Sequence, residues 1–213
     1  LSGPTVDRAP DWSPDGQFIV FQSNRSGNFD LWIVDIASGE LTQLTNEPSE
    51  ETMPKWSPDG KKIVFQSSVY PECDSITGIF DDGCNKNHVD ADAKSLVKAR
   101  VYTSLLYRHW TQWQTKRRNH LLVANVDGSD IHDLTPGTHD VPPFSLGGPE
   151  GYAISPDSEE LAFTMDADSQ PAISTNVDIY TVPLAGGESK KVTISSGADD
   201  GPQYSPDGKY LAF

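Results

Sequence analysis

Few residues in this chain of 213 have both the type and the spacing that chemistry requires. The clearest group is Tyr107, Arg108, His109 and Trp110, in which aromatic rings, a guanidinium and an imidazole follow one another directly. Such side chains can hold a ligand by stacking and by charged hydrogen bonds. We therefore expect these four residues to contact a ligand or a neighbouring domain. The alternative is that they only fasten their own segment to the rest of the fold.

The two cysteines, Cys73 and Cys84, are the next candidates. A disulfide between them would close a small loop in an oxidising compartment, and two unbonded thiols are the alternative. No further cysteine or histidine stands at the spacing of a zinc site, and the five histidines are scattered, so we expect no metal and no cofactor. His120 and His132 are expected at the surface.

Catalytic and nucleotide-binding motifs are missing from the sequence. It contains no G-x-S-x-G, H-E-x-x-H, G-x-G-x-x-G or phosphate loop, and we predict no catalytic residue in this chain. Sixteen lysines and arginines stand against 31 aspartates and glutamates, a net charge of −15 that repels nucleic acid and anionic lipid. The apolar runs fall far short of the roughly 20 residues that span a bilayer. We expect neither nucleic acid nor a membrane as a partner.

One short motif, S-P-D-G with an aromatic or apolar residue before it, recurs along the chain. Proline presets the first central position of a type I turn, aspartate tolerates the second, and glycine accepts the left-handed conformation that leads into the next strand. The motif therefore predicts a hairpin turn. The third copy has serine instead of glycine, which predicts strain of about 1 kcal/mol or another turn geometry. The copies are Trp12–Gly16, Trp56–Gly60, Ile154–Ser158 and Tyr204–Gly208.

Each copy continues in the same register. After each turn comes a short apolar run that ends in phenylalanine. In three copies a second apolar block follows, and a glycine-containing turn connects it to a short segment that ends in threonine. The second block and its threonine are 15 residues apart in all three, from Asp30 to Thr45, His120 to Thr135 and Asp178 to Thr193. This pattern predicts four antiparallel strands per copy, with runs buried on both faces.

Four-stranded units of this kind bury their faces by standing side by side around an axis. The expected fold is all-β, a β-propeller segment of four-stranded antiparallel blades. Propellers close with about four to eight blades, so three and a half blades form an incomplete ring and indicate a fragment of a longer polypeptide. The blades are expected over 6–45, 50–135 and 151–194, with a half blade over 199–213.

The second blade is expected to contain one large insertion, over 68–119. It has eight cations and six anions, so its net charge is +2 against −17 for the rest of the chain. Large insertions on a repeat scaffold often carry binding roles, and this one holds both cysteines and the Tyr107–Trp110 group. The run Val97–Trp113 fits a helix as well as an extended hairpin. The pair Glu50 and Glu51 is expected in an exposed loop.

The repeats resemble the PD40 repeats, which are WD40-like, of TolB and of the prolyl oligopeptidase family of serine peptidases. The middle of the chain is more specific: Leu106–Trp110, Asp140–Phe144 and Ser174–Tyr180 resemble the propeller of dipeptidyl-peptidase-like and acylaminoacyl-peptidase-like members. The resemblance implies a propeller that covers a C-terminal α/β-hydrolase domain and filters peptide substrates. The catalytic serine, aspartate and histidine of that family lie in the hydrolase domain, so none is transferred to this chain.

Two functions follow from the resemblance. The first is a non-catalytic propeller part of a secreted or periplasmic serine peptidase, with the α/β-hydrolase domain of the same polypeptide and a peptide substrate as partners. The alternative is a TolB-like protein–protein interaction propeller without enzyme activity. The aromatic and basic insertion favours the first.

Overall fold

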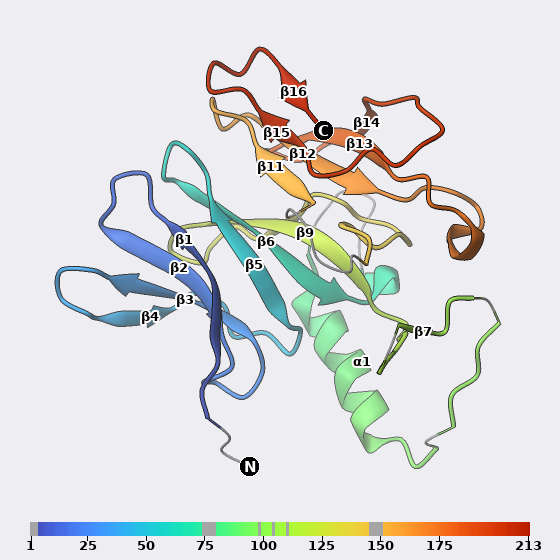
Figure 1. The fold of residues 1–213 in the computed structure, drawn as a ribbon. Coiled ribbons are helices and arrows are strands. Elements are labelled where there is room, and N and C mark those ends of the chain that lie inside the picture. Colours follow the sequence, from blue (N-terminus) through green and yellow to red (C-terminus); the bar gives the residue numbers. More distant parts are fainter. Residues whose placement is uncertain (1–3, 74–79, 98, 104, 110, 145–150) are drawn as a thin grey trace.

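The computed structural model describes residues 4–73, 80–97, 99–103, 105–109, 111–144 and 151–213. Three four-stranded antiparallel sheets and a two-stranded sheet near the C-terminus follow one another along the chain, and a second two-stranded sheet lies in the insertion (Figure 1). The first strand of the first sheet neighbours the first strand of the second, and the first strand of the third neighbours that of the last, as inner strands of propeller blades do. This arrangement confirms the predicted fold. The first sheet contains β1 (Asp7–Trp12), β2 (Phe18–Ser23), β3 (Asp30–Asp35) and β4 (Leu41–Gln43), in that order.

The second and third sheets repeat the plan. The second has β5 (Glu51–Trp56), β6 (Lys62–Val69), β9 (Arg118–Asn125) and β10 (His132–Asp133). The third has β11 (Tyr152–Ile154), β12 (Glu160–Met165), β13 (Asp178–Pro183) and β14 (Lys190–Lys191). The last sheet pairs β15 (Gln203–Tyr204) with β16 (Leu211–Ala212).

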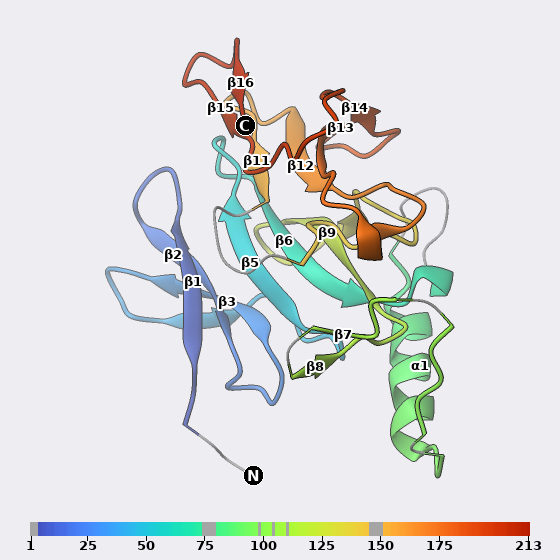
Figure 2. The ribbon, with the colours of Figure 1, turned by 45° about the vertical axis from the view of Figure 1, so that its right-hand side comes forward.

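The insertion leaves the second sheet between β6 and β9. Ser68 pairs with Asn119 and Val69 with Arg118, so the ends of the range 68–119 belong to the sheet. The inserted elements are η1 (Pro71–Cys73), α1 (Asp82–Lys94) and the hairpin of β7 (Arg108–His109) with β8 (Gln112–Trp113). Figure 2 shows α1 and the hairpin on the same side of the second sheet. Of the two forms open for Val97–Trp113, the described residues include the extended hairpin and no helix.

The S-P-D-G turns share one set of hydrogen bonds. In the first, Ser13 Oγ donates to Asp15 Oδ1 at 2.6 Å and accepts from Phe18 N at 2.9 Å. The Ser13 hydroxyl, followed by the backbone N–H of Gln17 at 3.0 Å, lowers the pKa of Asp15 by donating to its carboxylate. Ser158 adopts the left-handed φ of 63° that glycine occupies in the other copies, so the strained alternative applies. The same serine–aspartate bond recurs at Ser57–Asp59, Ser155–Asp157 and Ser205–Asp207.

Two apolar layers hold the sheets together. Ile63 and Phe65 face the first sheet, where they pack with Val20 and Leu31. Val64, between them in sequence, faces the third sheet and its layer. Alternate residues of one strand thus enter two different layers, which confirms that the apolar runs are buried on both faces.

Turn glycines differ in how closely the adjacent blade approaches them. Gly39 and Gly128 occupy corresponding turns, with φ of 72° and 81°. A Cβ on Gly39 would meet nothing within 4 Å, whereas one on Gly128 would lie 2.7 Å from Leu44 O in the first blade. We expect Gly39→Ala to lower the free energy of unfolding by about 1 kcal/mol, and Gly128→Ala by about 2–4 kcal/mol. Chemical denaturation of both variants checks this, and equal losses would contradict it.

Candidate functional site

A cavity of about 780 Å³ opens between the second and third sheets. Its walls come from the loops after β10 and β12, from the segment before β13 and from the insertion. Met165 and Asp178 pair at the end of β12 and β13 that is farthest from the S-P-D-G turn. The cavity loops adjoin these two residues, so they lie at the end of the sheets opposite the S-P-D-G turns. This volume is in the range of pockets that bind small ligands or short peptide segments.

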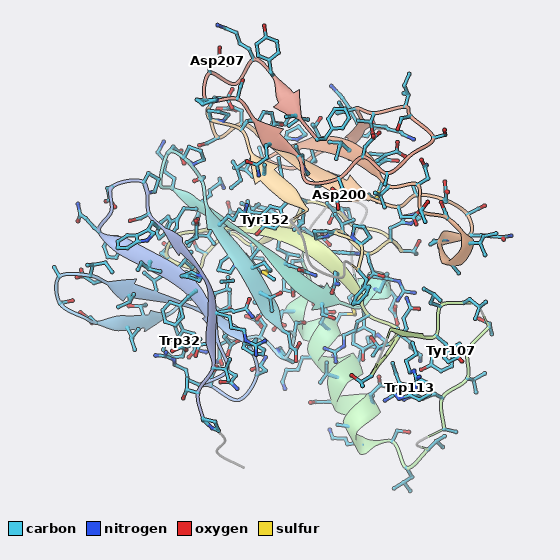
Figure 3. All side chains as sticks on the ribbon, in the orientation of Figure 1. Trp32, Tyr107, Trp113, Tyr152, Asp200 and Asp207 are labelled. Atoms are coloured by element: carbon cyan, nitrogen blue, oxygen red, sulfur yellow. A yellow bond between two sulfur atoms is a disulfide. The ribbon has the colours of Figure 1, made fainter. Side chains whose placement is uncertain are left out.

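Three carboxylates line the cavity, those of Asp140, Asp166 and Asp200. Asp140 Oδ1 accepts a hydrogen bond from Asn119 N at 2.9 Å. Asp200 Oδ1 accepts from Thr164 Oγ1 at 2.8 Å and from Gly201 N at 2.6 Å, and Figure 3 places this residue above the second sheet. Residues of β9 and β12 thus hold the carboxylates of Asp140 and Asp200 in position, and the cavity wall is acidic.

Arg118 and His139 also line the cavity. The Arg118 guanidinium donates to backbone carbonyls, with 3.1 Å from Nε to Thr138 O and 3.1 Å from Nη1 to Thr115 O. These bonds hold the guanidinium against the loops. With three carboxylates against one guanidinium, the lining favours a ligand that carries positive charge.

Apolar side chains complete the wall. Leu105 and Leu106 come from the insertion, Phe144 from the loop after β10 and Ile173 from η2 (Pro171–Ile173). Ile173 is 79% exposed and Leu105 62% exposed. Apolar groups open to water at the rim of an acidic cavity suit an amphipathic ligand such as a peptide.

The residues expected to contact a ligand lie beside this cavity and not in its described lining. The Tyr107 ring packs with Trp113 at 6.1 Å between centroids, and Arg108 lies over the same Trp113 ring at 5.5 Å (Figure 3). These contacts stay within the arm, by which we mean residues 95–117. Trp110 and the side chain of His109 lie outside the described residues. A ligand-contacting role for the group of four stays a prediction.

A disulfide joins Cys73 to Cys84, with 5.5 Å between the Cα atoms. It ties η1 to the first turn of α1, where Asp81 caps the helix by accepting from Cys84 N at 2.9 Å. Buried Asn85 accepts from Tyr70 N at 2.8 Å, just after β6. The helix is therefore fixed to the end of the second sheet at its N-terminus.

The expectation that Glu50 and Glu51 lie in an exposed loop is wrong for Glu51, which begins β5 and is 1% exposed. Burial raises its pKa well above the usual value, and Ser67 Oγ donates to its Oε1 at 3.0 Å. The expectation that His120 lies at the surface is also wrong, since its side chain is fully buried. Asp133 Oδ2 lies 2.7 Å from its Nδ1.

We compared the positions of the metal-binding atoms of histidine, cysteine, aspartate and glutamate in the described part of the chain. One group of three has these atoms within 4.8 Å of one another, namely Cys73, Cys84 and His88. Both sulfurs of that group belong to the disulfide. No helix in the described part of the chain has the length and hydrophobicity that crossing a membrane requires.

Sequence reasoning missed the lining carboxylates. Asp166 lies in a short acidic stretch after β12, where its Oδ1 accepts a hydrogen bond from Asp168 N at 3.0 Å. Asp140 and Asp200 carry a usable signal: each lies in a loop that connects one repeat to the next. Loops at corresponding places in different blades meet at the same end of a propeller, where ligands bind.

Comparisons with known proteins agree with this fold. Dipeptidyl-peptidase 5 of Porphyromonas gingivalis is 30% identical over 224 residues, covering 96% of this chain and 29% of the relative. Dipeptidyl-peptidase 5 of Aspergillus oryzae is 30% identical over 149 residues, covering 57% of this chain and 20% of the relative. The chain spans less than a third of the length of either relative.

Solved structures give the same fold at low identity. TolB from Acinetobacter baumannii matches with a TM-score of 0.53 and 16% identity, over 95% of this chain and 36% of that one. An acylaminoacyl peptidase from Pyrococcus horikoshii matches with a TM-score of 0.55 and 12% identity, over 88% and 25%. Residues 2–152 match the PD40 family, described as the TolB beta propeller domain. With more than half its residues matched and three sheets in blade arrangement, this chain belongs to the PD40 family of TolB-like β-propellers.

Proposed function

We propose that this chain is the non-catalytic β-propeller part of a serine peptidase, where it gates and positions peptides for an α/β-hydrolase domain of the same polypeptide. The observation that carries the proposal is the acidic, apolar-rimmed cavity at the loop end of the blades. The match to dipeptidyl-peptidase 5 over 96% of the chain supports it. The disulfide supports a periplasmic or secreted location, because such bonds persist in oxidising compartments.

The chemistry of the cavity suits a peptide near its amino terminus. A protonated amino group carries the positive charge that Asp140, Asp166 and Asp200 favour, and apolar side chains can pack on the rim. The sequence has no nucleophile motif, so the blades bind and orient while bond cleavage belongs to the other domain.

Hydrolysis assays on the intact polypeptide and on this chain alone test the proposal. We expect the intact polypeptide to release dipeptides from peptide amides and this chain alone to release none. An intact polypeptide that cleaves no dipeptidyl or acyl-aminoacyl amide would contradict the proposed function.

Ile173→Arg tests the cavity itself, because Ile173 lines the rim and is largely exposed, so its replacement leaves the fold intact. It removes an apolar contact and adds positive charge to a site that attracts cations. We expect KM for peptides of about ten residues to rise about tenfold, which corresponds to about 1.4 kcal/mol. The KM for a dipeptide amide changes less. The matched control is Ile36→Arg, on the turn after β3, where KM should stay the same.

The interaction propeller is the second candidate, and the arm favours it. Leu96 is 97% exposed and Val101 88% exposed, and apolar side chains presented this way commonly bind other proteins. An intact polypeptide without peptidase activity that forms a stable complex through the arm would support this function instead.

A further inference from the structure

Two pairs of acidic side chains cross the boundary between the first blade and its neighbours. Asp30 at the start of β3 and Glu51 at the start of β5 share a side-chain hydrogen bond between the first and second blades. Glu47, in the loop that joins these blades, shares one with Asp82 at the start of α1. We call these four residues the acid clasp. Asp30 and Glu51 are 0% and 1% exposed, whereas Glu47 and Asp82 are half-buried.

A hydrogen bond between two carboxyl groups requires a proton, because ionised carboxylates only accept. In the inner pair, Asp30 Oδ2 accepts from Ser26 Oγ and from Gln43 Nε2. Glu51 Oε1 accepts from Ser67 Oγ at 3.0 Å. Asp30 Oδ1 and Glu51 Oε2 are buried and receive no N–H or hydroxyl donor. These two oxygens are left to form the bond between the carboxyl groups, and one proton must lie between them.

The third blade shows what the first blade lacks. Asp178 begins β13, the strand that corresponds to β3, and Lys191 Nζ lies 2.7 Å from its Oδ2. The position of Lys191 is taken in the first blade by Gln43, whose neutral amide lies 3.2 Å from Asp30 Oδ2. The first blade therefore has the buried acid without the cation that balances it in the third blade. A proton shared with the second blade can supply that balance.

The charges that act most strongly on the clasp are those of its own members. Asp82 and Asp30 act on Glu47, while Asp30 and Glu47 act on Glu51. The ion pairs among the described residues involve none of the four acids. Basic side chains on α1 and in the loop before β3 pair elsewhere: Lys86 with Asp90 at 3.6 Å, and Arg25 with Asp7 at 2.9 Å.

The environment favours the protonated form of these acids. Burial raises the pKa of Asp30 and of Glu51. Burial, followed by the carboxyl group of Asp82, raises the pKa of Glu47 from 4.5 to about 8. The folded chain then keeps a proton that the unfolded chain releases, so the free energy of unfolding falls as the pH rises from 4.5 through about 8. Above that range the paired groups are ionised and repel each other.

We propose that the acid clasp is a pH-dependent fastening, which holds the first blade to the second blade and to the insertion while it keeps its protons and loosens when they leave. Strands β3 and β5 are in contact across this boundary. Once ionised, the half-buried outer pair can turn to water, whereas the inner pair can do so only if the boundary between β3 and β5 opens. The proposal concerns the fold and holds whether or not the polypeptide is a peptidase.

Hydrogen–deuterium exchange of the intact polypeptide at pH 6 and pH 9, on either side of the Glu47 pKa of about 8, tests the proposal. The exchange rate of residues 44–52 is divided by that of residues 192–200, the corresponding segment of the third blade, which removes the direct effect of pH on exchange. We expect this ratio to rise about tenfold or more, because one pH unit above its pKa an acid is about tenfold more ionised than protonated. A ratio that stays the same overturns the proposal.

Three variants locate the effect. Glu47→Gln provides an amide that donates to Asp82 at every pH, and Gln43→Lys gives Asp30 the lysine found at this position in the third blade. Both replaced side chains are partly exposed, so both variants should fold, and each should lower the rise of the ratio about threefold or more. The matched control is Glu50→Gln, the exposed neighbour, in which the rise should be unaltered. An undiminished rise in both Glu47→Gln and Gln43→Lys overturns the proposal.

Discussion

Replacing Tyr152 with alanine is expected to lower the free energy of unfolding of the propeller by about 3–5 kcal/mol, the usual cost of emptying a large buried aromatic site. Tyr152 begins β11 and is 1% exposed (Figure 3). Its hydroxyl donates to Met53 O on β5, and Lys55 Nζ lies 5.2 Å from the ring centroid. One side chain thus joins the inner strands of the second and third blades. Denaturation of the intact polypeptide, followed by a probe of the propeller, measures the loss.

Two further variants separate the contributions. Tyr152→Phe keeps the ring but leaves Met53 O without its donor, so we expect a loss of about 1–3 kcal/mol. Tyr107→Ala removes a half-exposed ring from the arm and should cost about 1 kcal/mol or less. If Tyr107→Ala destabilises the propeller as much as Tyr152→Ala, the inner-strand contact is not what holds the blades together.

Replacing Asp133 with alanine is the second large expected loss, about 3–5 kcal/mol, because it removes one partner of a fully buried histidine–aspartate pair. Asp133 Oδ2 lies 2.7 Å from His120 Nδ1, and Gly137 O lies 3.0 Å from Nε2 of the same ring. The imidazole is therefore held on both of its ring nitrogens. Asp133 Oδ1 also accepts from Thr135 N at 2.8 Å. Without the Asp133 side chain, the buried imidazole and the backbone N–H of Thr135 lose their partner.

The chain offers a matched control at the start of β10 and in the turn before it. His132 and Asp130 form a pair with a 2.8 Å contact, but their side chains are 40% and 54% exposed. Solvated ion pairs contribute about 0–1 kcal/mol, so Asp130→Ala should change stability very little. Urea titrations of both variants compare a buried and an exposed histidine–aspartate pair in one blade. Similar losses would show that burial does not set the energy of the Asp133 contact.

The sequence predicts the blades well because the same local chemistry is repeated. Serine and aspartate specify each turn through short-range hydrogen bonds and proline through its fixed backbone angle, and the threonine 15 residues after the start of each second block accepts from the strand beside it. In all three full blades the threonine hydroxyl binds a backbone N–H at 2.9 Å. Interactions within about 15 residues need no knowledge of the tertiary fold.

The insertion was less predictable because its structure depends on distant contacts. Helix α1 contains few apolar residues, so it shows no amphipathic period, and its position depends on the disulfide and on Asn85 contacting the end of β6. Burial of Glu51 was missed for a similar reason, since its neighbours Ser67 and Asp30 come from other strands. Composition alone gives a glutamate in a loop no reason to be buried.

The cavity likewise required the tertiary structure, because its wall combines residues from the insertion with residues up to Asp200. The repeat predicted that blade loops would meet at one end of the propeller. It could not predict which side chains would face the space between them, since Tyr107 and Arg108 turn to Trp113 whereas neighbouring Leu105 and Leu106 line the cavity.

The S-P-D-G turns of adjacent blades touch one another. A Cβ on Gly60 would lie 3.8 Å from Pro14, one on Gly208 would lie 3.8 Å from Pro156, and Asp59 N donates to Ser158 Oγ at 3.0 Å. Spacing between blades is thereby set at the end remote from the insertion. Replacing the segment between β6 and β9 with one of another length should therefore leave the angle between adjacent blades unchanged. This position is consequently suitable for grafting foreign recognition loops.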